Sequence, residues 1–277
     1  GDDIIDDATT SLGDAIDSYL GVSIADYGAA IGQPIIRGMS GSRVKILKNG
    51  MVNRDVSGLG ADHLNDVDFN DLKQLEIVKG PSSLLYANGT IGGIINVVDE
   101  CIAPEDYLLP KFNAGFETQS VNNGDSQYIN YGNNISGFNI NIGYKESNFG
   151  NYDIPHDAVI HDGEEDHDEE ELSYIENSDL ASEAFKFGVS KVGDWGYVGV
   201  SFDNLESVYG IPFHGEEHEG DDHGEERIFS STDSESLTIK GSLNSSLSLI
   251  NKIDFNYRNS DYSLTEAHEE EDHGDDD

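Results

Sequence analysis

Three acidic stretches of this chain carry almost all of its histidines. They span residues 153–171, 214–226 and 266–277, and they hold eight of the nine histidines and 25 of the 55 acidic residues. The histidines are His156, His161 and His167, then His214, His218 and His223, then His268 and His273. Imidazole nitrogen and carboxylate oxygen both bind zinc, and imidazole also suits copper and nickel, whereas calcium and magnesium prefer oxygen alone. The pattern predicts weak, exchanging transition-metal sites, and it does not separate zinc from nickel or copper.

A simpler interpretation is that these stretches are solvated acidic loops of low complexity. That interpretation accounts for the acids but leaves the histidines unexplained. Because neutral imidazole is needed to bind a metal, the metal hypothesis predicts that affinity falls below about pH 6.5.

The composition excludes several classes of protein. A formal net charge of -40 excludes nucleic acid as a partner, since phosphates would be repelled, and it favours cations. No HExxH motif or nucleophile–base arrangement is present, so we expect no enzyme activity and no bound cofactor. The single cysteine, Cys101, excludes an internal disulfide and a cysteine-rich zinc site. No apolar run is long enough for a transmembrane helix.

The residue pattern of 1–104 predicts a compact mixed α+β domain. Apolar residues at helical spacing predict a helix over residues 11–20, with Ser11 as its cap. Short β-rich runs follow at 34–38, 44–47, 75–78 and 94–98. Asn49-Gly50 indicates a tight turn, and residues 82–86 a short helix.

Residues 105–277 instead alternate with period two, for example at 112–117, 138–145, 237–243 and 253–258. One face is apolar and the other is small, polar or charged, as expected where a barrel wall separates lipid from a polar lumen. The pattern predicts about seven strands of an antiparallel transmembrane β-barrel. Since closed barrels of this kind have an even number of strands, we expect an incomplete barrel continuing beyond residue 277.

The links between the expected strands alternate between short and long. Short turns are expected at 136–137, 193–194 and around Asn244-Ser245, and long links at 120–124, 151–178, 210–227 and from 263 onward. Antiparallel order places all long links at one end, as in outer-membrane barrels with long external loops. All three histidine stretches then lie on the external end.

Two segments of the first hundred residues resemble the plug of TonB-dependent outer-membrane receptors. QPIIRG at 33–38 with SRVKILKNG at 42–50 is similar to that family's "IRG … R-V … L-x-[DN]-G" segment. LEIVKGPSSLLY at 75–86, followed by IGGIINVV at 91–98, is similar to its "IE-V-x-[RK]-G-P … GG-x-I-N-V" segment. Lys79 and Asn88 depart slightly from the pattern. The resemblance implies a plug followed by part of a 22-stranded barrel, in a bacterial outer membrane, working with TonB.

Within that family the chain looks most like the zinc-uptake branch. The resemblance implies that Asp62 and His63 form part of a metal site that faces the lumen. The alternative is that they are ordinary polar residues of a loop. Acidic external loops would gather the cation, and TonB would supply the energy for its release. Two rival functions remain open: a siderophore, haem or cobalamin receptor, and a surface metal-buffering protein without transport.

Overall fold

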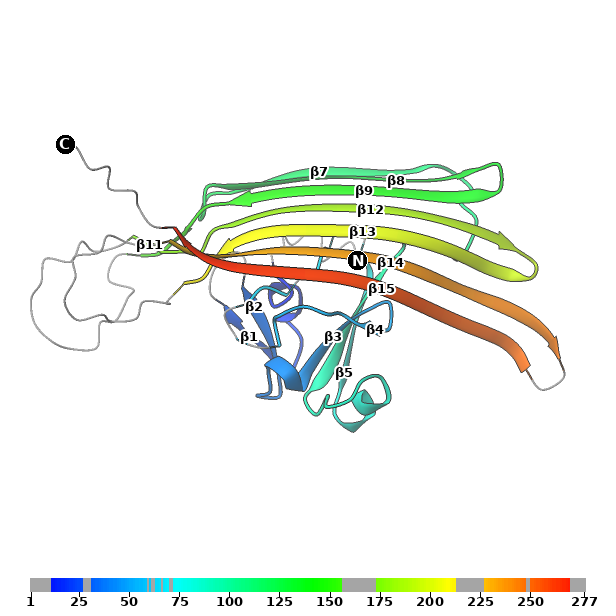
Figure 1. Ribbon diagram of the computed structural model, residues 1–277, viewed down its shortest axis with the longest axis horizontal. Helices are drawn as coiled ribbons and strands as arrows, with labels where there is room; N and C mark the ends of the chain where they lie inside the picture. Colours follow the sequence, from blue (N-terminus) through cyan, green and yellow to red (C-terminus); the bar gives the residue numbers. More distant parts are fainter. Residues whose placement is uncertain are drawn as a thin grey trace, which may run out of the picture.

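A seven-stranded antiparallel sheet curves around a smaller β-rich unit (Figure 1). The computed structural model describes residues 11–26, 31–58, 60, 63–65, 67–69, 72–155, 173–212, 227–247 and 250–269. Among these residues, no helix is both long and apolar enough to cross a membrane. The predicted arrangement, a compact mixed unit followed by antiparallel strands, is confirmed.

The large sheet follows chain order from one edge to the other. Its strands are β7 (Lys111–Gln119), β8 (Gly124–Ile135), β9 (Phe138–Phe149), β12 (Leu180–Gly193), β13 (Gly196–Gly210), β14 (Arg227–Leu247) and β15 (Ile250–Glu269). Two short strands, β10 (Tyr152–Asp153) and β11 (Tyr174–Ile175), pair with each other in the link between β9 and β12.

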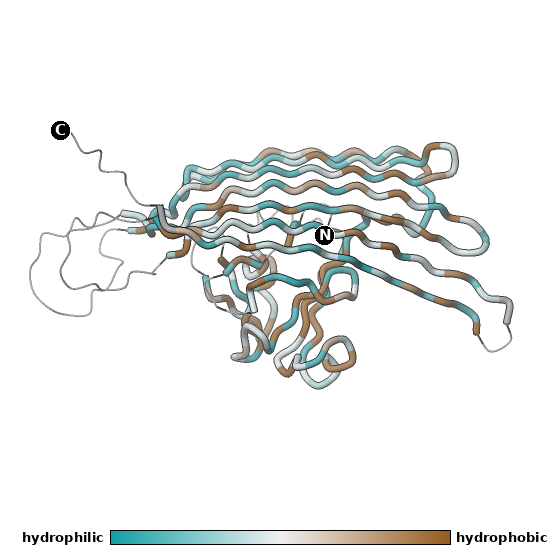
Figure 2. The backbone as a smooth tube through the Cα atoms, viewed as in Figure 1, coloured by the Kyte–Doolittle hydropathy of each residue, from teal (hydrophilic) through white to brown (hydrophobic). Residues whose placement is uncertain are grey.

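The strands alternate in hydropathy along their length (Figure 2). Residues in register across six strands form an exposed apolar row on the convex face: Phe112, Tyr131, Ile142, Phe187, Phe202 and Leu237. The opposite face is largely polar, and its residues on the central strands are the ones buried, among them Ser126, Ser147, Lys186 and Ser207. This division is the one expected for strands with lipid on one side and a polar interior on the other.

The two ends of the large sheet differ in their connections. At the turn end, two residues join β8 to β9 and β12 to β13; Ser136 and Gly137 both have positive φ, which suits a tight hairpin. At the loop end lie the links 150–179 and 211–226. The turn predicted around Asn244-Ser245 is displaced along the chain, because β14 continues to Leu247, which pairs with Ile250. Asn244 instead hydrogen-bonds the turn beside it, through its backbone N–H to the Trp195 carbonyl and its side chain to the Asp194 carbonyl.

The long link predicted from residue 263 onward begins later than expected. β15 continues to Glu269 because residues 263–269 pair without interruption with β14, up to Glu269 opposite Arg227. His268 therefore lies in a strand, opposite Ile228, and not in a loop.

The smaller unit is built on a four-stranded sheet of order β4-β3-β6-β5. Its strands are β3 (Val44–Lys48), β4 (Met51–Val52), β5 (Leu72–Lys79) and β6 (Gly93–Asp99). A hairpin of β1 (Val22–Asp26) and β2 (Gly32–Ile36) and the 3-10 helices η1 (Asp14–Ile16), η2 (Gly41–Arg43) and η3 (Pro81–Leu85) complete it. The predicted Asn49-Gly50 turn is present, with φ of 53° and 80°.

The helix predicted over residues 11–20 is reduced to the three residues of η1. Leu12, Ala15 and Ile16 are buried in the core of the smaller unit, whereas Tyr19 is 48% and Leu20 94% exposed. A short helix depends on tertiary packing, and here only one turn has a core to pack on. The predicted Ser11 cap is also wrong: the residue before η1 is Gly13, which gives no side-chain cap.

Residues 100–107, here called the connecting segment, run from β6 to β7 along the concave wall of the large sheet. Asn141 donates to the carbonyls of Glu100 and Cys101 at 3.2 and 3.0 Å, and Ser190 donates to the Ala103 carbonyl at 2.6 Å. Asn139 donates to the Glu105 carbonyl at 3.2 Å. Wall side chains thus satisfy the backbone of a segment that has no regular structure of its own.

Candidate functional site at the interface of the two units

Three of the levels at which the smaller unit meets the concave wall are rows of residues in register across neighbouring strands. The first, the tyrosine row, lies nearest the loop end and consists of Phe149, Leu180, Tyr209 and Ser230. The second, the hydroxyl row, consists of Ser126, Ser147, Ser182, Ser207 and Thr232. The third, the charged row, contains Lys186 and Asp203.

His63 meets the wall at the tyrosine row. Its Nδ1 lies 3.3 Å from the hydroxyl of Tyr209, a side chain that is completely buried. The next residue, Leu64, packs with Phe149, Leu180 and Tyr209 in an apolar cluster. His63 is therefore held at the interface of the two units, close to the point where β13 ends at Gly210.

Gln33 fixes the backbone that carries His63. Its side-chain amide is buried and donates to the carbonyls of Ser57 at 3.0 Å, Gly60 at 3.4 Å and His63 at 2.9 Å. An irregular loop has few internal hydrogen bonds, so a buried amide that reaches three of its carbonyls limits where the histidine can lie. Gln33 belongs to the QPIIRG segment, whose glutamine the sequence analysis did not assign a role.

Most of the predicted metal ligands lie outside the described residues. These are Asp62, His156, His161, His167, His214, His218, His223 and His273. The backbone of His268 is placed in β15. Within the described part of the chain, no group of three or more His, Cys, Asp or Glu side chains is gathered closely enough to hold a metal. The proposed ligand sets therefore remain predictions.

The charged row was missed by the sequence analysis. Lys186 forms a buried ion pair with Asp68 of the smaller unit at 2.7 Å, and Lys48 of the smaller unit pairs with Asp203. The sequence did contain a signal for this row, because Lys186 is a lysine inside a strand, on the face that carries small residues. Removal of one partner of such a buried ion pair is strongly destabilising, because the other charge is left buried without a counter-ion.

Asp99, at the end of β6, adds a third carboxyl to this charged level. Burial by itself would raise the pKa of the Asp99 carboxyl, but Lys48 and Lys186 nearby oppose that effect. Hydrogen bonds from Asn49 and from the Cys101 backbone N–H also oppose it, and the net result is a lowered pKa. The carboxylate form is therefore favoured where the two units meet.

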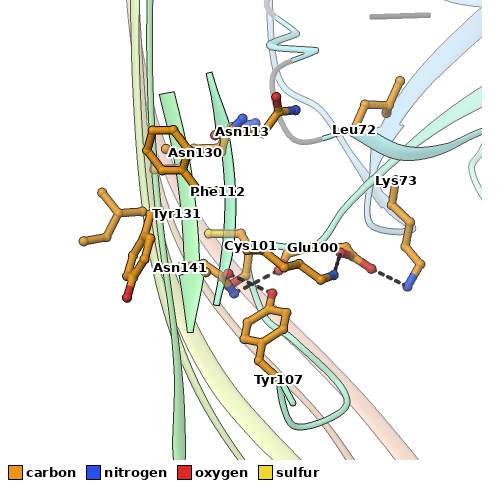
Figure 3. Close-up of a pocket in the computed structure, with 15 residues that line it drawn as sticks. Leu72, Lys73, Glu100, Cys101, Tyr107, Phe112, Asn113, Asn130, Tyr131 and Asn141 are labelled. Carbon is orange, nitrogen blue, oxygen red and sulfur yellow. Dashed lines mark hydrogen bonds and ion pairs between the residues drawn. The ribbon is translucent and has the colours of Figure 1, made fainter. Parts of the chain in front are cut away.

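A cavity of about 360 Å³ lies between β5, the connecting segment and strands β7–β9 (Figure 3). Glu100 forms ion pairs with Lys73 at 2.8 Å and with Lys111 at 3.2 Å, and Tyr107 donates its hydroxyl to Asn141 at 2.8 Å. Burial works against the ionised form of Glu100, but the two lysines outweigh it and lower the pKa. Lys73, Lys111 and Lys186 line the cavity against the single carboxylate of Glu100, so its lining is net positive, and it contains no histidine.

Comparison with known proteins identifies the smaller unit. Residues 1–94 match the sequence family described as TonB-dependent Receptor Plug Domain. The chain is 32% identical over 118 residues to a haemin receptor of Yersinia enterocolitica; the match covers 42% of this chain and 16% of that protein.

Solved structures share the fold of both units. The copper transporter OprC aligns with a TM-score of 0.70 and 16% identity, over 92% of this chain and 36% of that one. The FrpB iron transporter of Neisseria meningitidis (F3-3 variant) aligns with a TM-score of 0.64 and 12% identity, over 90% and 37%. The siderophore receptor PiuA of Acinetobacter baumannii aligns with a TM-score of 0.64 and 14% identity, over 94% and 35%. The chain thus spans little more than a third of the length of these structures.

Proposed function

Since residues 1–94 match the TonB-dependent receptor plug domain, we propose that this chain belongs to an outer-membrane receptor that imports a metal ion, with zinc as the cargo. Residues 1–104 would be the plug, and residues 105–277 the first strands of the barrel with their external loops. TonB would be the energy-supplying partner, and lipid would cover the convex apolar face. The structural neighbours named above, which are transporters and receptors, support this assignment.

The observation that carries the metal proposal is the position of His63. Its imidazole lies at the plug–barrel interface, 3.3 Å from the Tyr209 hydroxyl, at the end of the sheet from which the histidine-rich links depart. An imidazole beside a phenol offers a nitrogen ligand and an oxygen that donates or accepts. Asp62 precedes His63 in the chain and would supply the carboxylate.

The proposed cycle contains no covalent chemistry. The acidic links at 153–171, 214–226 and 266–277 raise the local cation concentration through their charge and exchange metal through their histidines. The ion then passes to Asp62 and His63, where fewer and better-placed ligands hold it more tightly. Movement of the plug, driven through TonB, would alter this interface and release the ion.

Zinc binding to the purified full-length protein tests the plug site. We expect His63→Ala to remove the tightest zinc-binding event seen by calorimetry and to leave the weaker events of the loops. Tyr209→Phe keeps the ring and serves as the milder variant, with a smaller loss. A tight event that survives His63→Ala would contradict the assignment.

Haem import is the second candidate, and the haemin receptor of Yersinia enterocolitica is the specific reason to keep it. The same cells should be tested for growth on haem as the sole iron source. Growth that depends on the receptor, without any dependence of zinc uptake on it, would favour the haem function.

A further inference from the structure

A small cavity lies beside the tyrosine row, between the plug and the hydroxyl row, and polar and apolar residues line it in similar number. Its volume is about 50 Å³, and it is lined by plug residues 64–69 together with the facing residues of β7, β8, β9, β12 and β13. One water molecule needs roughly 10–15 Å³ of cavity volume measured in this way. The cavity therefore has room for about four water molecules or ions of similar size.

Two buried polar atoms at this cavity lack a hydrogen-bond partner. Asn65 is 5% exposed and Ser207 is 3% exposed, and neither Asn65 Oδ1 nor Ser207 Oγ is hydrogen-bonded. The amide of Asn65 is oriented by its nitrogen, which donates to the Gly32 carbonyl at 3.4 Å. Buried polar atoms without a partner are rare in native proteins, so each calls for an occupant of the cavity.

The chemistry of these atoms restricts what the occupant is. A carboxamide oxygen only accepts hydrogen bonds, so its partner must be a donor or a cation. Glu117 and Asp68 also line the cavity; Asp68 is paired with Lys186, so Glu117 is the carboxylate that favours positive charge here. Lys145 lines it as well, and its positive charge offsets part of this attraction.

The cavity continues the path that starts at His63. On the plug, Asn65 follows His63 by two residues; on β13, Ser207 precedes Tyr209 by two residues and faces the same side. Two residues along a strand cover about 7 Å. The pairs His63 with Tyr209 and Asn65 with Ser207 are therefore successive levels along one wall, above the buried Asp68–Lys186 ion pair.

We propose that this cavity is a second cation-binding station, where a divalent metal ion that has left His63 is held by Asn65, Ser207 and part of its own water shell. The inference rests on the proposed function and names the next site along it. Carboxamide and hydroxyl oxygens are weaker zinc ligands than imidazole, so the station binds the ion weakly and releases it readily. The ion pair below it must open before the ion moves further.

The test uses crystals of the full-length protein soaked in zinc, with anomalous scattering measured at the zinc edge. We expect one peak at His63 and a weaker one between Asn65 and Ser207. Asn65→Ala and Ser207→Ala should each remove the weaker peak and leave the peak at His63. Ser201→Ala is the matched control, because Ser201 is buried on the same face of β13 and does not line the cavity.

Uptake of labelled zinc provides the second readout. Loss of even a group that only supports a metal's ligands lowers affinity roughly tenfold or more, so Asn65→Ala should lower uptake several-fold at limiting zinc, and Ser201→Ala should not. A peak at His63 with only solvent in the cavity, or equal uptake in the two variants, overturns the second station and leaves the proposed function intact. Absence of both the His63 peak and receptor-dependent uptake overturns the proposed function itself.

Discussion

Gln33 is the residue on which the placement of His63 depends most. Its one side-chain amide serves three carbonyls of the loop 57–63, so a single substitution releases all three. We expect Gln33→Leu to destabilise the protein by about 1–3 kcal/mol, because buried carbonyls lose their donor. Zinc affinity should fall as well, although Gln33 is not a ligand.

The control for this prediction is Gln74→Leu, since Gln74 is an exposed glutamine of the same plug whose hydrogen bond goes to the neighbouring Glu76. Thermal unfolding and zinc calorimetry on the two variants check it. Equal zinc affinity in Gln33→Leu and wild type would show that the loop keeps its shape without Gln33.

Asp99 makes the plug–barrel contact sensitive to acid. Its pKa is lowered from the ordinary value of 3.8, so ionised Asp99 stabilises the folded state at pH values above about 3.8. That contribution is lost as the pH falls through the lower folded-state value. We expect hydrogen-exchange protection of β6 to be constant from pH 7 to 5 and to decrease below pH 4, after correction for intrinsic rates. In Asp99→Asn this part of the decrease should be missing; an unchanged profile would refute the role of Asp99.

At the scale of elements, the connecting segment is the feature that fixes the plug to the wall. A Cβ atom at Gly188 of β12 would overlap the Cys101 carbonyl. Because that carbonyl belongs to the backbone, the connecting segment itself must shift. We therefore expect Gly188→Ala to loosen residues 100–107 and to expose Cys101 to thiol reagents. In Gly58→Ala, where a Cβ meets open space, Cys101 should remain protected. Slow labelling in both variants would contradict this account.

Four strands of the large sheet also carry an aligned row of exposed carboxylates. Glu146, Glu183, Glu206 and Asp233 are in direct register on β9, β12, β13 and β14. Like charges directly opposite each other across strands are destabilising by roughly 0.2–1 kcal/mol per pair. Glu183→Gln should therefore raise the melting temperature at low salt, and Gln127→Glu, which extends the row, should lower it. The opposite order of the two melting temperatures would exclude repulsion as the dominant effect.

The strands and their faces were predictable from the sequence because alternation has a period of two and depends only on local residue types. Alternating segments such as 138–145 and 237–243 therefore lie within β9 and β14. The ends of β14 and β15 were not predictable, because they depend on pairing between strands. The helix over 11–20 failed for the same reason: only the tertiary core decides how much of it is packed.

The candidate site was predictable only in part. His63 could be singled out, since it is the one histidine outside the acidic stretches. Its partner Tyr209 lies 146 residues away, and Asp68 meets Lys186 across the same interface; no local pattern encodes such contacts. The buried hydroxyl row is equally invisible along the chain, because each strand contributes a single serine or threonine to it.

At the scale of the whole molecule, the excess negative charge and the paired charges lie in different regions. The chain has a formal net charge of -40, yet the interface between plug and wall contains matched ion pairs. Excess negative charge at the loop end attracts cations, whereas the paired interior offers a cation few uncompensated carboxylates. Under the proposed function, this arrangement would favour capture at the loop end and passage at defined points, beginning at His63.

The most direct test of the central claim is uptake of labelled zinc by cells that produce the full-length protein. Wild type should be compared with Asp62→Ala/His63→Ala, and with His273→Ala as a control in an acidic stretch that keeps His268. We predict receptor-dependent uptake that collapses in the double variant and is nearly unchanged in the control. Zinc uptake that is equal with and without the receptor would contradict the account.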